Sequence, residues 1–450
     1  MTVFGSVFYF IIAISVLVAV HEYGHYIVGR WCGMKVLRFS IGFGKPIWST
    51  RRGPDDTEYQ VSMIPLGGYV KFLDEREGPV APEDRGRAFT DKPVPARIAV
   101  LLAGPAFNFL FAIAAYFVLF VYGVPSIYPK VGEIAPASYA AEAGLRSGDR
   151  ILAVDGEDVG DWEAALTGIL ETMVADGRIA LRVEGEDGAV RDALLDVGNN
   201  ATRLTEPGAL LDGLGFALWQ PPAIVGDAVP DGAAEAAGLQ SGDRILTIDG
   251  ETIESFSDLR RVVSVRPGAD VAVTFERAGE TYERLVALGS VEQDGQSVGQ
   301  LGIRLSETNS NYWYLRKYPV STAVGEAVSQ TWDSTKFTLS MFMRMLTGEV
   351  SIKNISGPIN IAQYAESSAS AGLDRFVHFL ALVSISLGVI NLIPIPILDG
   401  GQIVYQAIEG VKGSPLSLRS QIVGQQVGIL ALLLLMSFAF YNDIARLLAN

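Results

Sequence analysis

The stretch FYFIIAISVLVAVHEYGHYIV, residues 8–28, decides how the whole chain is interpreted. At about 1.5 Å per helical residue, this apolar run is long enough to cross a hydrocarbon core of roughly 30 Å. No Lys or Arg precedes it, no small-residue cleavage pattern follows it, and it carries three ionisable groups. These features favour a retained membrane span over a cleaved signal peptide.

Within that run, His21, Glu22 and His25 form the pattern H-E-x-x-H. On a helix, positions i and i+4 share a face, so both imidazoles can bind one metal ion while Glu22 reaches a water on it. The alternative is a pair of hydrogen-bonded core histidines beside a buried glutamate. A charged group at the centre of a membrane helix costs roughly 2.5–3.5 kcal/mol, and a bound dication would offset that cost. We therefore predict a zinc site.

A catalytic zinc needs a third protein ligand, and the chain has only three histidines. His378 begins the third apolar run, at the opposite end from the H-E-x-x-H pattern, so we expect it to be an interfacial or packed residue. Asp399 closes that run in NLIPIPILDGG, residues 391–401. Pro394 and Pro396 break helical hydrogen bonds there, and irregular backbone at membrane depth survives only where it lines a cavity. Taken alone, this motif fits equally well an aspartate-glycine turn that leaves the membrane. Because the chain also contains the H-E-x-x-H pattern, we predict that Asp399 is the third ligand.

The number of apolar runs predicts the topology. Further runs cover about 98–121, 376–398 and 423–440, which gives four spans and both termini on one side. The connection 30–97 carries 12 Lys/Arg against 9 Asp/Glu, whereas residues 123–373 carry 19 against 36. The positive-inside rule places the first connection in the cytoplasm, so we expect the acidic segment to be external and periplasmic.

The composition limits the function further. Hydrophobic residues make up 49% of the 450 and charged residues 19%, which is apolar for a soluble protein. The formal net charge of −15 excludes the basic footprint that nucleic-acid binding requires. Cys32 is the single cysteine, so no internal disulfide is possible.

The acidic segment contains an internal repeat. The 29 residues from Val131 and the 29 from Val225 share 16 identities, including GL-x-SGDRIL-x-x-DGE, which is typical of a strand ending in a tight turn. Two copies predict two small domains, which either contact peptides or serve as spacers.

Between Val320 and Leu346, apolar residues recur at helical spacing among charged ones. This favours an amphipathic helix on the outer membrane surface, the alternative being a soluble helix packed on the second repeat.

Taken together, these motifs resemble the site-2 protease family of intramembrane zinc metalloproteases. They are HEYGH in the first span, GPxxN in the second (Gly104, Pro105, Asn108), the paired repeats, which resemble bacterial PDZ domains, and NxxPxPxLDGG in the third. The four-span layout with two PDZ domains resembles the bacterial sigma-E-regulating branch of that family. The match covers essentially the whole chain.

The resemblance implies a function and a site. It implies cleavage of single-span membrane proteins, such as anti-sigma factors or remnant signal peptides, after a first external cut. It assigns zinc to His21, His25 and Asp399 and the base to Glu22, and it implies that Asn391 contacts the substrate backbone or the oxyanion. Further candidate substrate-binding residues are Asn108, Pro394, Gly67 and Gly68. The segments 39–46 and 57–72 resemble the family's membrane-associated β-hairpin, whose edge could pair with an unwound substrate.

The expected fold is a multi-pass α-helical membrane protein with four transmembrane helices, two inserted PDZ-like α+β domains and a small membrane-associated β-hairpin. Its expected segments are 1–125 with two spans, 126–220 and 221–306 with the PDZ-like domains, 307–373 with the peripheral helix, and 374–450 with two spans. We expect membrane proteins, peptide termini and lipid as partners, in a bacterial inner membrane. A membrane scaffold without catalysis is the alternative function, and a transporter is disfavoured because paired broken helices are missing.

Overall fold

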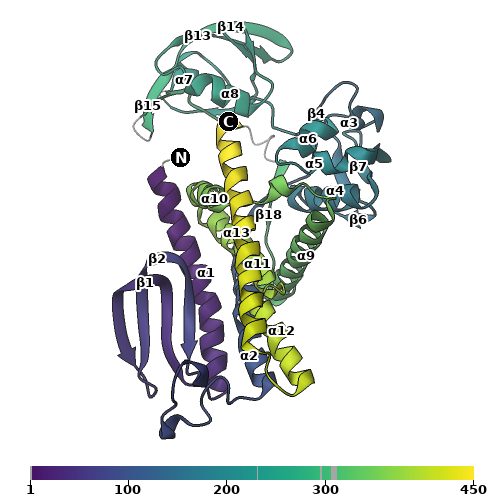
Figure 1. The fold of residues 1–450 in the computed structure, drawn as a ribbon. Coiled ribbons are helices and arrows are strands. Elements are labelled where there is room, and N and C mark those ends of the chain that lie inside the picture. Colours follow the sequence, from purple (N-terminus) through teal and green to yellow (C-terminus); the bar gives the residue numbers. More distant parts are fainter. Residues whose placement is uncertain (1–2, 231, 294–295, 306–311, 450) are drawn as a thin grey trace. The chain divides into compact units, whose positions relative to one another are not determined.

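The computed structural model describes residues 3–230, 232–293, 296–305 and 312–449, and it separates into two compact units (Figure 1). The helical unit comprises Met1–Val124 and Lys317–Asn450, and the repeat unit comprises Pro125–Arg316. Each unit is described by itself. The segment boundary expected between residues 306 and 307 lies outside the described residues.

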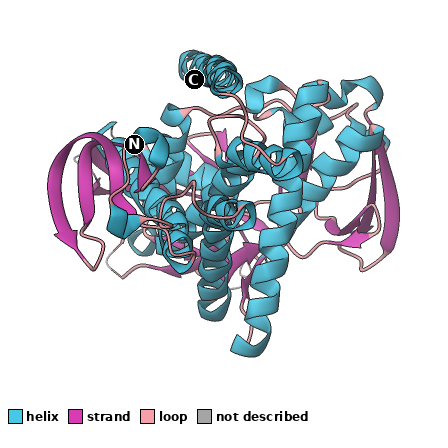
Figure 2. Ribbon diagram, turned by 60° about the horizontal axis from the view of Figure 1, so that its bottom comes forward, coloured by secondary structure: helices cyan, strands magenta, loops and turns pink. Residues whose placement is uncertain are grey.

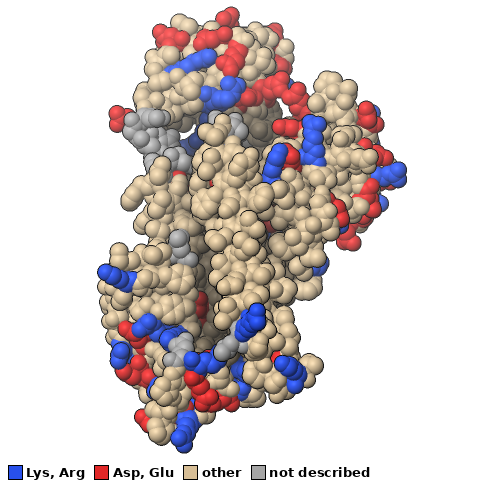
Figure 3. Space-filling model, viewed as in Figure 1, with Lys and Arg blue, Asp and Glu red and all other residues tan. Residues whose placement is uncertain are grey.

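Within the described residues, four helices are long and apolar enough to cross a membrane, as the sequence predicted. They are α1 (Val3–Trp31), α2 (Val94–Tyr122), α11 (Leu373–Leu392) and α13 (Leu418–Ala449). The third ends six residues before the predicted end at Leu398, because Pro394 and Pro396 follow and have no N–H to continue the helix. Figure 3 shows uncharged surface along α13 in the helical unit, which suits contact with lipid tails.

Helix α2 is the centre of the helical unit. It packs against α1, α9 (Val320–Thr347), α11 and α12 (Asp399–Lys412). Small side chains make this close packing possible: Ala112 and Ala115 of α2 are buried with Ala323 and Ala327 of α9 and Ala381 of α11. Fixing α1, α11 and α12 against one helix places the two motifs predicted to bind metal around the same central element.

Helix α9 has two contrasting faces. Ala323, Ala327 and Thr331 are buried, whereas the apolar residues that predicted the helix, among them Val324 and Trp332, are exposed. The prediction of a helix is therefore confirmed, and the small residues rather than the large ones face its protein neighbours. The remaining short helices of this unit are η1 (Glu75–Glu77), η2 (Pro82–Asp84), η5 (Ile352–Asn354) and α10 (Pro358–Ala371).

Strands β1 (Val36–Arg52) and β2 (Thr57–Phe72) form a curved antiparallel sheet beside α1 (Figure 2). Both strands bend, so residues 38–41 pair with 58–61 on one side and with 68–71 on the other. Gly42 and Gly44 allow the bend of β1, since both have positive φ. Segment 68–72 is consequently an edge of this sheet, and its other side faces the site described below.

The repeat unit contains two copies of one strand order. The first has β6–β5–β7–β8 with β4 paired to β9, and the second has β12–β11–β13–β14 with β10 paired to β17. The pairing register is also shared: Val131 and Ile134 face Leu218 and Phe216, as Val225 and Ala228 face Leu305 and Ile303. The sequence repeat therefore corresponds to a structural repeat.

The two copies differ between their last strands. The first copy consists of β4 (Val131–Ile134), α3 (Tyr139–Glu142), β5 (Arg150–Val154), β6 (Glu157–Asp158), α4 (Trp162–Asp176), β7 (Arg178–Glu184), β8 (Val190–Asp196), η3 (Gly198–Asn200), α5 (Ala201–Leu204), α6 (Ala209–Leu214) and β9 (Phe216–Leu218). The second consists of β10 (Val225–Ala228), α7 (Ala233–Ala236), β11 (Arg244–Ile248), β12 (Glu251–Thr252), α8 (Phe256–Ser264), β13 (Asp270–Arg277), β14 (Glu280–Ala287), β15 (Gly289–Gln293), β16 (Gln296–Gln300) and β17 (Ile303–Leu305). Two short helices in the first copy are thus replaced by the β15–β16 hairpin in the second. A ribbon of β3 (Val124–Ile127) and β18 (Trp313–Arg316) completes the described strands.

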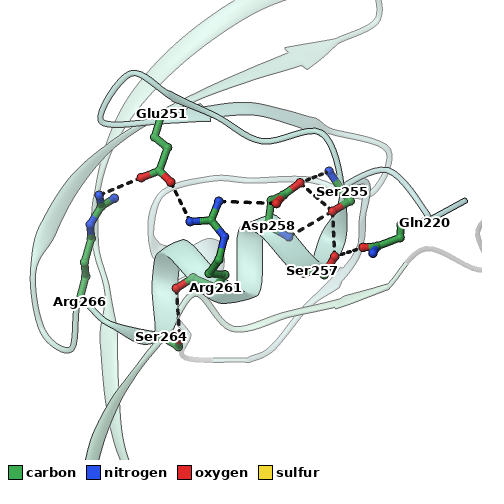
Figure 4. A network of polar contacts seen from close by, with 8 residues as sticks. All are labelled: Gln220, Glu251, Ser255, Ser257, Asp258, Arg261, Ser264 and Arg266. Atoms are coloured by element: carbon green, nitrogen blue, oxygen red, sulfur yellow. Dashed lines mark hydrogen bonds and ion pairs between the residues drawn. The ribbon is translucent and has the colours of Figure 1, made fainter. Parts of the chain in front are cut away.

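Helix α8 of the second copy is fixed by a polar network (Figure 4). Ser255 caps its N-terminus by accepting from the backbone N–H of Asp258, and Asp258 accepts in return from the backbone N–H of Ser255. The Ser255 hydroxyl also donates to Asp258 and lowers the pKa of that carboxyl group. Arg261 and Arg266 both reach Glu251, which ties the helix and its following turn to β12. Such a capping box stabilises a short helix.

Candidate metal centre

Helix α1 presents the three residues of the H-E-x-x-H pattern on its buried side. His21, Glu22 and His25 are each no more than 9% exposed although they lie in a membrane-length helix. The Nε2 atoms of the two imidazoles are 3.2 Å apart. This is the shared face that the i, i+4 spacing predicted.

Asp399 arrives at the same point from the other end of the chain. Its Oδ2 atom lies 3.1 Å from Nε2 of His21 and 3.4 Å from Nε2 of His25. Burial alone would raise the pKa of Asp399, but hydrogen bonds with the two imidazoles lower it to about 2, so the carboxylate is ionised. Asp399 is also the first residue of α12, where the positive end of the helix dipole favours a negative charge.

The chain between α11 and α12 explains why a Gly-Gly pair follows this aspartate. After Pro394 and Pro396 the backbone turns back sharply, with the Leu398 N–H donating to the Ile395 carbonyl at 2.8 Å. A Cβ atom on Gly400 would lie 2.3 Å from the Leu392 carbonyl oxygen, and one on Gly401 would lie 2.1 Å from that of Ile395. Any larger residue would push α12, and with it Asp399, away from the imidazoles.

The donor set fits zinc. One ligand atom from each of His21, His25 and Asp399 lies within 4.8 Å of the others, and this is the group of metal-ligating side chains found among the described residues. Zinc bonds of about 2.0–2.1 Å in tetrahedral geometry separate neighbouring ligand atoms by about 3.3 Å. The three distances of 3.1, 3.2 and 3.4 Å agree with that spacing. Apart from the two imidazole nitrogens, the buried Asp399 Oδ2 atom has no hydrogen-bond partner among the described residues, as expected of an atom directed at a cation.

Helix α2 supports both imidazoles from behind. Nδ1 of His25 lies 2.7 Å from the Val100 carbonyl oxygen, and Nδ1 of His21 lies 3.1 Å from the side-chain amide of Asn108. Between these two contacts, Gly104 provides the space: a Cβ atom there would lie 2.3 Å from Nε2 of His25. The GPxxN element therefore packs against the histidines rather than facing the cavity.

A cavity of about 670 Å³ opens in front of the three donor groups. Glu22 lines it together with Val70, a residue of the edge segment 68–72. Gly68 permits this approach of sheet and helix, since a Cβ atom there would lie 2.7 Å from Val18 of α1. Asn391, from the last turn of α11, lines the same cavity. The cavity thus joins donors, a carboxylate and an open strand edge.

The structure brings together most of the predicted site residues. His21, Glu22, His25, Asp399, Asn391, Gly67 and Gly68 all line the cavity. Asn108 is fully buried behind His21, and Pro394 is exposed and does not line the cavity. His378 packs edge-on against the ring of Tyr116, as expected for a packed residue.

Two features that support the site were not predicted from the sequence. One is the Val100 carbonyl, because a backbone atom leaves no residue signature. The other is the bidentate ion pair between Arg97 at the start of α2 and Glu409 of α12, with distances of 2.7 and 3.2 Å. Arg97 is buried, and the pair ties α12, which begins with Asp399, to α2. The two residues are 312 positions apart in the sequence, so this ion pair cannot be predicted unless the fold is known.

Comparisons with known proteins agree with this site. The model of Peptidase family M50 matches residues 9–435. The chain is 41% identical over 444 residues to the regulator of sigma-E protease RseP of Escherichia coli, covering 97% of this chain and 98% of the relative. It is 40% identical over 444 residues to a Vibrio cholerae protein named "Putative zinc metalloprotease", with coverage of 97% and 98%.

A solved structure of a separate domain is among those that match a part of the chain. It is the PDZ domain of an SdrC-like protein from Listeria monocytogenes, which is 19% identical, covers 20% of this chain and 94% of its own, and has a TM-score of 0.17.

The membrane-length helices, the buried donor set and these matches define a zinc-dependent protease that acts on membrane proteins. The chain belongs to peptidase family M50. Its four apolar helices and its similarity to RseP make it an inner-membrane protein.

Proposed function

We propose that this protein cuts the transmembrane segments of single-span membrane proteins at a zinc ion held by His21, His25 and Asp399. The observation that carries the proposal is the set of mutual distances among the three donor atoms, 3.1 to 3.4 Å, which suits one tetrahedral zinc. These donors come from α1 and α12, so the site forms only in the folded chain.

The chain's own groups around the site have distinct roles. When bound, zinc would polarise the scissile carbonyl and bring the pKa of a water molecule toward about 7. Glu22 takes the proton of that water and returns it to the leaving amine. The side-chain amide of Asn391 donates to the scissile carbonyl oxygen as negative charge develops on it. Both residues line the cavity that holds the donor atoms.

The edge segment 68–72 orients the substrate. A peptide bond inside a helix is shielded by its own hydrogen bonds, so the substrate must unwind before attack. An extended substrate can add as a strand to an exposed sheet edge, and this edge lies along the cavity. Gly67 and Gly68 line the cavity at the start of this edge, where they contact the substrate backbone in this proposal. Pro394 keeps its proposed substrate role at the exposed turn after α11.

The substrate class and orientation follow from the relatives and from charge. Relatives named regulator of sigma-E protease favour a membrane-bound anti-sigma factor as substrate, with remnant signal peptides as a second kind. The excess of Lys and Arg in residues 30–97 supports a cytoplasmic location for the active-site end. The acidic repeat unit is then periplasmic.

The repeats are PDZ-like domains that receive peptide termini, in this proposal. A groove of about 540 Å³ in the second copy is lined by Phe256, Leu259 and Val263 of α8 and by residues 299–303. Such a groove between a helix and a strand suits an extended peptide end. In the first copy Trp162 stacks on Phe216, with ring centroids 6.3 Å apart.

The exposed apolar face of α9, including Trp332, contacts the lipid surface.

Reconstituted cleavage tests the proposed function. Purified protein is placed in liposomes with a single-span substrate that has lost its external domain, and the products are identified by mass spectrometry. We expect a cut within the apolar segment, loss of cleavage after treatment with a zinc chelator, and recovery when zinc is restored. A matched substrate that keeps its external domain is expected to stay intact. Cleavage that persists after zinc removal, or a cut outside the membrane segment, would refute the proposal.

A further inference from the structure

Asn108 is a fully buried polar residue of α2 whose amide is only half used. Its Nδ2 atom lies 3.1 Å from Nδ1 of His21. Its Oδ1 atom is buried and has no hydrogen-bond partner among the described residues. Only one end of this amide can face Nδ1 of His21, so the choice between its two ends needs a physical reason.

The chemistry of His21 supplies one. A neutral imidazole has one N–H and one lone pair. Nε2 of His21 lies 3.1 Å from Asp399 and 3.2 Å from Nε2 of His25, so the lone pair must be on Nε2 if the ring ligates zinc. The proton is then on Nδ1, and the partner of Nδ1 must be an acceptor. The two ends of the Asn108 amide have nearly the same shape, so turning the amide places Oδ1 against Nδ1.

His25 shows the same pattern with a backbone acceptor. Its Nδ1 atom lies 2.7 Å from the Val100 carbonyl oxygen, which can only accept, so its proton is on Nδ1 and Nε2 is free to bind a metal. Val100 and Asn108 lie on the same helix, two turns apart. Helix α2 thus offers one acceptor to each imidazole.

Asn108 is also held in place. Its backbone oxygen accepts a hydrogen bond from the hydroxyl of Ser384 in α11 at 2.9 Å, and both residues are fully buried. One turn earlier, Gly104 lets α2 lie directly against the two rings. The side chain therefore has a fixed position relative to His21.

We propose that Asn108 is a positioning residue that accepts the Nδ1–H of His21 through Oδ1 and so keeps Nε2 directed at the metal. The proposal rests on the proposed zinc site. It gives Asn108 a place behind the ligand rather than in contact with the substrate. Outer-shell partners of this kind typically change metal affinity 10- to 100-fold.

Two substitutions of Asn108 with similarly shaped residues test whether its side chain acts as a hydrogen-bond acceptor toward His21. Asn108→Asp keeps an acceptor and removes the donor, and Asn108→Leu removes both. In purified full-length protein, zinc affinity is measured by competition with a chelator. We expect Asn108→Leu to bind zinc 10- to 100-fold more weakly and Asn108→Asp to bind it at least as tightly as wild type. Asn442→Leu, the same change at a buried asparagine of α13, is expected to leave zinc affinity unchanged.

The outcomes are distinguishable. If Asn108→Leu binds zinc like wild type, or if Asn108→Asp loses it to the same extent, the inference is wrong. If Asn108→Leu does not fold, Asn108→Ala replaces it with the same expectation. Wild-type protein that holds no zinc would instead overturn the proposed function itself.

Discussion

Replacing Asp399 by alanine is expected to remove zinc from the purified protein and to abolish cleavage. Asp399 is the single donor from outside α1, and its oxygen lies within 3.4 Å of both imidazole nitrogens. Two histidines alone leave zinc without the third protein ligand of a catalytic site. We expect at least about a 100-fold loss of zinc affinity, more than an outer-shell partner supplies, and no measurable product. Elemental analysis of the purified variant gives the zinc content directly.

The controls for this variant separate ligation from folding. Asp374→Ala changes a half-buried aspartate at the start of α11 and is expected to keep full zinc content. Asp399→His offers another zinc-binding side chain at the same place and is expected to recover part of the metal. An Asp399→Ala protein with one zinc per chain would show that the carboxylate is not a ligand.

Replacing Glu22 by glutamine is expected to stop cleavage while zinc stays bound. Glu22 lines the cavity beside the donors but is not among the three grouped ligand atoms. Glutamine has nearly the same shape and cannot accept the proton of the attacking water. General-base catalysis typically contributes 10²–10⁴-fold, and we expect a loss of about that size in kcat. Rates in liposomes and zinc content are measured on the same preparation.

The Glu22→Gln variant also distinguishes a protease from a membrane scaffold. A membrane scaffold that only holds partners would lose nothing when Glu22 becomes glutamine. Glu75→Gln, an exposed position of η1, is the matched control and is expected to cleave at the wild-type rate. Unchanged cleavage by Glu22→Gln would remove the residue from the mechanism.

Local patterns in the sequence predicted those parts of the site whose geometry is fixed within a single helix or strand. The i, i+4 spacing of His21 and His25 needs only a helix, and the apolar runs predicted all four membrane-length helices. Asp399 was predicted because it closes the third apolar run, where two prolines interrupt the helix, in a chain that also has the H-E-x-x-H pattern. The repeat in residues 131–253 likewise predicted two copies of one strand order.

Features that depend on packing between elements could not be predicted. Asn108 of GPxxN was predicted as a candidate substrate-binding residue, whereas α2 packs this element against the histidines, with Gly104 close to the rings and Asn108 behind His21. The end of α11 at Leu392 was missed because an apolar run continues through Pro394 and Pro396. Periodicity predicted helix α9, but it did not predict that the alanines of this helix pack against α2 and α11.

Crystallographic location of zinc by its anomalous scattering tests the central claim most directly. The claim is that residues almost four hundred positions apart hold one ion below the membrane surface. We expect a single zinc peak bonded to Nε2 of His21, Nε2 of His25 and a carboxylate oxygen of Asp399, at about 2.0–2.2 Å each. A peak elsewhere, or zinc bound to the histidines with the Asp399 carboxylate turned away, would contradict it.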